Sequence, residues 1–138
     1  MNSASPRRFW SAAVSSGLTM FLLAGLWNLI VFPNLGIMFA PGLLREVPIF
    51  PLIIFGYITL GAALAFIGTH SQFSPHPRRH WIIAGALVME VAFALSGLAL
   101  QGTYNFPLEA IPYDLLWYVV EGAAGGLIAS FFLRNHHA

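Results

Sequence analysis

The sequence lacks cysteine and lysine and carries few charges of either sign. The absence of cysteine excludes disulfides, thiol catalysis and thiolate metal sites. Charged residues make up 8% of the 138 residues, whereas soluble domains carry about 25%. The formal net charge of +1 argues against nucleic-acid binding, which requires a basic patch that contacts many phosphates. We therefore expect a lipid environment and no nucleic-acid partner.

Long apolar segments take the place of these charges. Hydrophobic residues make up 58% of the chain and the mean hydropathy is +0.76. Four segments stand out, at residues 9–32, 48–69, 80–101 and 112–133. Each spans about 22 residues, or about 33 Å as a helix, which matches a hydrocarbon core of about 30 Å. The sequence predicts an all-α membrane protein, a four-helix transmembrane bundle that forms a single domain over 1–138.

The arginines predict the orientation of this bundle. One side of the predicted membrane holds Arg7, Arg8, Arg78, Arg79 and Arg134, and the other side holds only Arg45. The positive-inside rule places both termini and the 70–79 loop in the cytoplasm. We expect an integral protein of a bacterial inner membrane with N-in/C-in topology.

The segment ends also carry helix-starting signals. Ser5-Pro6 and Ser74-Pro75 each look like an N-cap followed by a proline in the first helical turn. No small-x-small cleavage site follows the first apolar segment, so we expect a retained helix rather than a signal peptide. The connections 33–47 and 102–111 are apolar, and we expect them to lie in the membrane interface or to pack on a partner.

An internal repeat links the two halves of the chain. An offset of 61 residues aligns Pro51 with Pro112, Tyr57 with Tyr118, and Gly61-Ala62-Ala63 with Gly122-Ala123-Ala124. Two helices per unit would give both units the same direction through the membrane. The alignment predicts two tandem helical hairpins, a parallel 2+2 repeat. The small residues of Gly122-x-x-x-Gly126 further predict close contact between helices.

Two glutamates lie near the middle of the last two apolar segments, Glu90 and Glu121. No arginine falls inside either segment, and a carboxyl group in hydrocarbon costs several kcal/mol unless it is protonated, paired or wet. The helices are adjacent and antiparallel, so we expect both acids at similar depth, sharing a proton and able to bind and release a cation or a proton. Alternatively, the protonated acids form hydrogen bonds that hold the helices together, each contributing about 1 kcal/mol. A third possibility is that one acid faces a charge on a partner subunit.

Four more polar or aromatic residues are candidates for the same ligand-binding or proton-binding site. They are Asn28, Asp114, Trp117 and Tyr118. Asp114 lies two turns from Glu121 on the same helical face, which would suit an acid at the entrance to the Glu121 site. Alternatively, it stabilises the first turn of its helix by interacting with the helix dipole. Asn28 would contact a ligand or Glu90, or bind another helix. Trp117 and Tyr118 would stack on a ligand if they line the same space as Glu121.

Five histidines map to the predicted cytoplasmic edge: His70, His76, His80, His136 and His137. Their spacing matches no zinc motif, and they are expected among lipid headgroups. His70 and His80 are the two candidate ligands for a metal or haem. We predict no cofactor.

Three functions follow from these features. The first is binding and transport of a small cationic or weakly polar solute, coupled to protonation of Glu90 and Glu121. The second is an accessory subunit of a larger membrane complex. The third is a membrane-embedded isomerase or cyclase that uses the same acids as general acid and base, although no catalytic triad, phosphate loop or His-Glu zinc motif is present. A bundle this small has little room for a path of its own, so we expect a homo-oligomer or a partner subunit.

Overall fold

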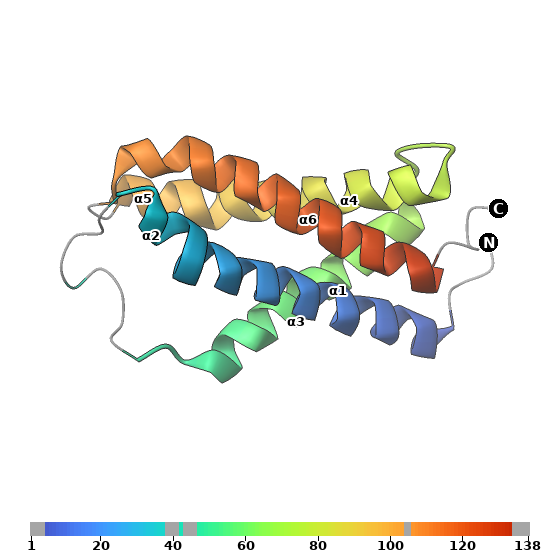
Figure 1. The fold of residues 1–138 in the computed structure, drawn as a ribbon. Helices are drawn as coiled ribbons and strands as arrows, with labels where there is room; N and C mark the ends of the chain where they lie inside the picture. Colours follow the sequence, from blue (N-terminus) through green and yellow to red (C-terminus); the bar gives the residue numbers. More distant parts are fainter. Residues whose placement is uncertain (1–4, 38–41, 43–46, 104–105, 134–138) are drawn as a thin grey trace.

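The computed structural model describes residues 5–37, 42, 47–103 and 106–133. Within these ranges all regular secondary structure is helical, and four helices are long and apolar enough to cross a membrane. These helices cover Pro6–Asn34, Phe50–His70, Pro77–Thr103 and Leu108–Leu133 (Figure 1). The prediction of an all-helical chain with four spans of membrane length is confirmed, and each of the four helices extends past a predicted bound by one to four residues.

Two of the long helices contain a wider, π-helical turn. The first helix consists of α1 (Pro6–Leu26), the π-helical turn η1 (Trp27–Val31) and α2 (Phe32–Asn34). The second is α3 (Phe50–His70) without interruption. The third consists of α4 (Pro77–Ala92), the π-helical turn η2 (Phe93–Leu98) and α5 (Ala99–Thr103), and the fourth of a short 3-10 turn, η3 (Leu108–Ala110), followed by α6 (Ile111–Leu133).

Prolines and caps set where these helices begin. Ser5 is the N-cap of α1, because its hydroxyl accepts a hydrogen bond from the Arg8 N–H at 3.5 Å, and Pro6 follows as predicted. The prediction for Ser74-Pro75 is wrong. The helix begins at Pro77, with His76 as its cap, since Ser74 instead accepts a hydrogen bond from the His76 N–H within the loop.

The helices form two packed pairs that are joined through α6. α4 packs along α6, and α1 lies against both α6 and α3. α3 crosses α1 at a steep angle, and its first half points away from the other helices (Figure 1). The first seven residues of α3, 50–56, are exposed at all but one position. The start of α1 and the end of α6 lie at the same end of the bundle.

Glycines set the two closest helix contacts. A methyl group on Gly85 or Gly122 would overlap the backbone of the other, and Gly126 is equally close to the Trp81 carbonyl. The predicted close contact at Gly122 and Gly126 is therefore confirmed. In the other pair, Gly61 lies against the Ala13 carbonyl.

The glycines Gly61 and Gly122 are equivalent in the 61-residue alignment, but the residues that face them are not. The counterpart of Gly85 in the first half is Ala24, whereas Gly61 faces Ala13. Along the first helix, the contact with Gly61 is therefore about three helical turns away from the position that the repeat alignment predicts. The 2+2 repeat stays a prediction from the sequence.

Candidate functional site

Asp114, in the first turns of α6, connects three of the four long helices. Its Oδ1 accepts a hydrogen bond from Trp27 Nε1 at 2.9 Å, and its Oδ2 accepts one from Gln101 Nε2 at 3.1 Å. The Asp114 side chain is 8% exposed. Because both carboxylate oxygens already have a protein donor, Asp114 is placed as an anchor for Trp27 and Gln101 and not as an acid open to an entrance.

Trp27 reaches Asp114 from the first residue of η1. Pro33 has no N–H and its ring would clash with the carbonyl four residues back. The preceding turn widens, and the Phe32 N–H bonds to the Trp27 carbonyl five residues away. The Trp27 ring then stacks on Trp117 of α6, with the ring centres 5.0 Å apart and the planes at 20°.

The second π-helical turn, η2, brings another aromatic side chain to the same part of α6. Ser96 and Gly97 lie in this turn, and the Ser96 hydroxyl donates to the Ala92 carbonyl at 2.7 Å. Such side-chain bonds to the backbone compete with the helix ladder. Phe93, which begins η2, packs on Tyr118 with the ring centres 4.8 Å apart. Single π-helical turns within α-helices are frequent at functional sites.

Glu121 lies two turns after Asp114 and is the most enclosed acid of the described chain. Its side chain is 2% exposed, and its Oε2 has no hydrogen-bond partner among the described residues. The Trp117 indole N–H is within reach of the carboxyl group but does not have the geometry of a formed hydrogen bond. Tyr57 of α3 and Tyr118 of α6 are close enough to interact electrostatically with the same group.

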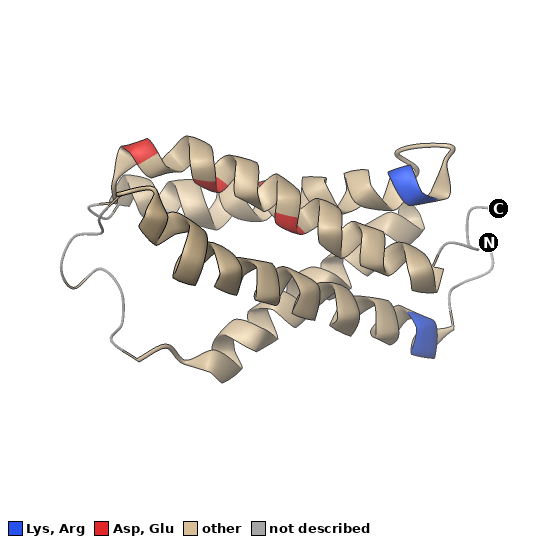
Figure 2. Ribbon diagram, in the orientation of Figure 1, with Lys and Arg blue, Asp and Glu red and all other residues tan. Residues whose placement is uncertain are grey.

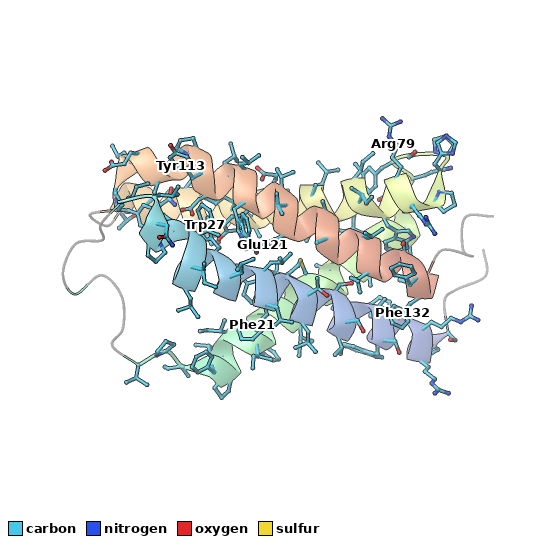
Figure 3. The ribbon with its side chains drawn as sticks, viewed as in Figure 1. Phe21, Trp27, Arg79, Tyr113, Glu121 and Phe132 are labelled. Atoms are coloured by element: carbon cyan, nitrogen blue, oxygen red, sulfur yellow. The ribbon has the colours of Figure 1, made fainter. Side chains whose placement is uncertain are left out.

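We refer to these residues as the acid–aromatic cluster. Its members come from α3, α6 and η1, and they are Trp27, Tyr57, Asp114, Trp117, Tyr118 and Glu121. Figure 3 shows Trp27 and Glu121 near the middle of the bundle, between the first and last helices, with Arg79 at one end. Four of the six predicted site residues, Asp114, Trp117, Tyr118 and Glu121, belong to this cluster.

Glu90 lies outside the cluster. The face of α4 that packs against α6 contains Trp81, Gly85, Met89 and Phe93, all buried. Glu90 follows Met89 and therefore points about 100° away from that face. The contacts of Gly85 with Gly122 and of Trp81 with Gly126 also place Glu90 about one turn, or about 6 Å, from the level of Glu121. The structure thus does not place the two glutamates at the same depth or on facing surfaces.

Asn28 is also separate from the cluster. It is exposed, and its Nδ2 donates to the Ala24 carbonyl of its own helix at 2.8 Å. This bond uses the side chain within the helix, so Asn28 contacts neither Glu90 nor Glu121 through it.

Charge is distributed unevenly along the bundle (Figure 2). The basic residues of the described chain are Arg7, Arg8, Arg78 and Arg79, at the first turns of α1 and α4. We call this the arginine end. The acids lie in the other part of the bundle, and within the described ranges no arginine lies on α3 or α6 to neutralise Glu121.

His80 closes the loop between α3 and α4. It is fully buried; its Nδ1 accepts a hydrogen bond from the Phe73 N–H at 3.1 Å, and its Nε2 lies 2.7 Å from the Gly68 carbonyl, to which it donates. Both ring nitrogens are therefore used by the backbone, which corrects the view of His80 as a metal or haem ligand. His70 is exposed and its Nδ1 lies 2.8 Å from the Phe66 carbonyl. In the described ranges no three His, Cys, Asp or Glu side chains gather as a metal site, and His136 and His137 lie outside them.

Three residues that contribute to the site were not among the predicted site residues. Trp27 and Gln101 lie 87 and 13 residues from Asp114 along the chain, so no local pattern connects them. Tyr57 had a signal: the repeat alignment pairs it with Tyr118, and the structure places both near Glu121.

Comparisons with protein-family models, with curated proteins and with solved structures found no match to this chain.

Proposed function

We propose that this chain is an integral membrane protein that binds and transports a small cationic solute in exchange for protons, with Glu121 as the exchanging group. The observation that carries the proposal is the Glu121 carboxyl group, 2% exposed and with one oxygen that lacks a hydrogen-bond partner in the described chain. Asp114, by contrast, has both oxygens bound by protein donors, and Glu90, whose Oε1 also lacks a hydrogen-bond partner in the described chain, is only half-buried.

The chemistry follows from the cost of a bare charge in the membrane. An ionised acid at the centre of a transmembrane helix costs about 2.5–3.5 kcal/mol on insertion scales. A proton or a cation at Glu121 removes this charge, and the described helices supply no arginine that does so. Binding of a cation therefore releases a proton, and loss of the cation takes one up. This mutual exclusion at one carboxyl group couples the two species.

The orientation and the membrane are part of the same proposal. We place the arginine end in the cytoplasm of a bacterial inner membrane, in agreement with the positive-inside rule. The acid–aromatic cluster then lies in the outer half and the middle of the bundle.

The test is proton movement in vesicles that contain the purified protein and an enclosed pH indicator. An inward gradient of sodium or choline chloride should move protons outward with wild-type protein, and Glu121→Gln should abolish this. Glu109→Gln is the matched control, because Glu109 is an exposed acid in η3. Glu90→Gln should leave the rate near that of the wild type. Proton movement that survives Glu121→Gln in a folded protein contradicts the proposal.

One feature favours a second function, an accessory subunit of a larger membrane complex. The first seven residues of α3, 50–56, carry exposed apolar side chains, among them Leu52 and Phe55 at 65% and 70% exposure. A second copy or another membrane subunit that packs on this segment would bury them. A fixed partner that co-purifies in mild detergent, and is lost with Leu52→Ser and Phe55→Ser, supports this function. A monomer that exchanges protons for cations excludes it.

A further inference from the structure

His80, near the start of α4, is a titratable side chain with no exposed surface. It contacts the loop of residues 71–76, which connects α3 to α4 at the arginine end of the bundle (Figure 1). The His80 ring stacks on Phe73 of this loop, with the ring centres 5.6 Å apart and the planes at 18°. Trp81 meets the same ring edge-on at 5.2 Å. The imidazole is therefore held in one orientation inside the protein.

The two hydrogen bonds of the ring determine its protonation state. The Phe73 N–H can only donate, so His80 Nδ1, at 3.1 Å, accepts with a lone pair. The Gly68 carbonyl can only accept, so His80 Nε2, at 2.7 Å, carries the proton. The ring is thus neutral and in a single tautomer. An imidazolium carries a proton on both nitrogens, which would turn one N–H against another at Phe73, so protonation of His80 breaks the bond to the loop.

These two bonds fasten the loop to both helices. α3 ends at His70, and the Gly68 carbonyl is one of its last four, which have no partner within the helix itself. His80 gives this carbonyl a donor and gives the loop an acceptor from α4. The helices are close here, because a methyl group on Gly68 would overlap the Trp81 ring. We call this connection of α3, the loop and α4 the His80 latch.

The charged groups at this end of the described chain are basic. The titratable and charged groups of the described elements that meet here are His70 on α3, His76 in the loop, Arg78 and Arg79 on α4, and Arg7 and Arg8 at the start of α1. The described end of α6, residues 122–133, contributes none. The acids of the described chain lie in the other part of the bundle (Figure 2). Protonation of His80 would add positive charge to an end that already carries several arginines.

We propose that His80 is a pH-sensitive latch, which holds the 71–76 loop to α3 and α4 when neutral and releases the loop when protonated. Histidine side chains ordinarily titrate near pH 6.5. Because the closed latch accepts only the neutral ring, release takes up one proton, and the latch weakens as the pH falls below about 6.5. In the orientation proposed above, the latch responds to cytoplasmic acid. It uses neither Glu121 nor Asp114 and does not depend on the proposed function.

Release of the loop acts on the least enclosed of the long helices. The first seven residues of α3 are exposed at all but one position, so α3 is held by its contact with α1 and by its second half. In that half, Leu64 packs in one cluster with Trp81 and Ala84 of α4. The His80 latch closes this contact at the arginine end. Acid therefore loosens the attachment of α3 to α4.

The experiment follows hydrogen exchange of single backbone amides by NMR, on the purified full chain in detergent between pH 7.5 and pH 5.0. Rates are corrected for the intrinsic effect of pH on exchange. The protection of the Phe73 amide should stay constant above about pH 6.5 and fall by up to tenfold per pH unit below it, since release takes up one proton. The Ala110 amide is the internal control, because it bonds to the Pro107 carbonyl at 3.0 Å without a titratable partner.

Variants assign the response to one histidine. His80→Asn retains an acceptor near the position of Nδ1 and His80→Gln a donor near that of Nε2, and neither side chain titrates; both should remove the pH dependence at Phe73. His70→Gln and His76→Gln are the matched controls, because both residues are exposed histidines beside the same loop. These two variants should keep the wild-type profile. Circular dichroism of each variant checks that the helices remain.

Each outcome supports the latch or overturns it. Constant protection of the wild-type Phe73 amide down to pH 5.0 overturns it, and this measurement needs no variant to fold. A pH dependence that persists in His80→Asn, or that is lost in His76→Gln, assigns the response to another group. An equal fall at Ala110 shows a general effect of acid on the bundle and also overturns the latch. None of these results bears on proton exchange at Glu121.

Discussion

Gly122→Ala should weaken the packing of α4 against α6, although alanine is the better helix former. Gly122 and Gly85 face each other where the helices are closest, and a methyl group on either would overlap the other's backbone. Forcing a methyl group into a packed site costs about 1–3 kcal/mol, whereas replacing glycine by alanine within a helix gains about 0.5–1 kcal/mol. We expect a net loss of about 1–2 kcal/mol in the free energy of unfolding.

The matched control is Gly56→Ala in α3. A methyl group there would meet nothing within 4 Å, so only the helix-forming gain remains and stability should rise or stay unchanged. The assay is reversible unfolding in mixed detergent and SDS micelles, followed by circular dichroism. The double variant Gly85→Ala/Gly122→Ala should cost less than the sum of the single changes, since one separation of the helices accommodates both methyl groups.

Gly122→Ala and Gly56→Ala should therefore change the free energy of unfolding in opposite directions. If both variants are stabilised to the same extent, the helices do not approach at Gly122, and the position of the adjacent Glu121 derived from this contact is wrong. If the helices do approach at Gly122, Gly122→Ala also displaces Glu121, and proton exchange should fall in vesicles even where the variant remains folded.

Two further predictions concern the Asp114 anchor and the orientation. Asp114→Leu leaves the Trp27 indole N–H and the Gln101 amide without their acceptor. It should lower the free energy of unfolding by about 1–3 kcal/mol in the micelle assay, and Asp114→Asn should lower it by less. If Asp114→Leu lowers stability by the same amount in the Trp27→Phe background, the Trp27 bond contributes nothing. Because the chain has no cysteine, single cysteines at positions 109 and 72 report the orientation without background labelling. In intact cells a membrane-impermeant maleimide should label Glu109→Cys and leave Gln72→Cys unlabelled. The reverse pattern would invert the proposed topology.

The sequence was sufficient for properties that depend on short stretches of chain. The length of a membrane span follows from the length of an apolar run in the sequence, so the four helices could be placed from the sequence alone. The close contact at Gly122 and Gly126 could also be predicted, because small side chains permit it whatever the partner helix is. The enclosed acid itself was recognised for a similar reason, since Glu121 stands in an apolar segment without a neighbouring arginine.

Only the tertiary structure decided which of the two glutamates is enclosed. Glu90 and Glu121 look alike in the sequence, but a step of one residue turns a side chain by about 100°, and the packing of α4 on α6 turns Glu90 away. The Trp27–Asp114 bond joins residues 87 positions apart, and it depends on a wide turn upstream of Pro33. These features depend on how helices rotate and cross relative to one another, which hydrophobic periodicity does not specify in a chain that is apolar on nearly every face.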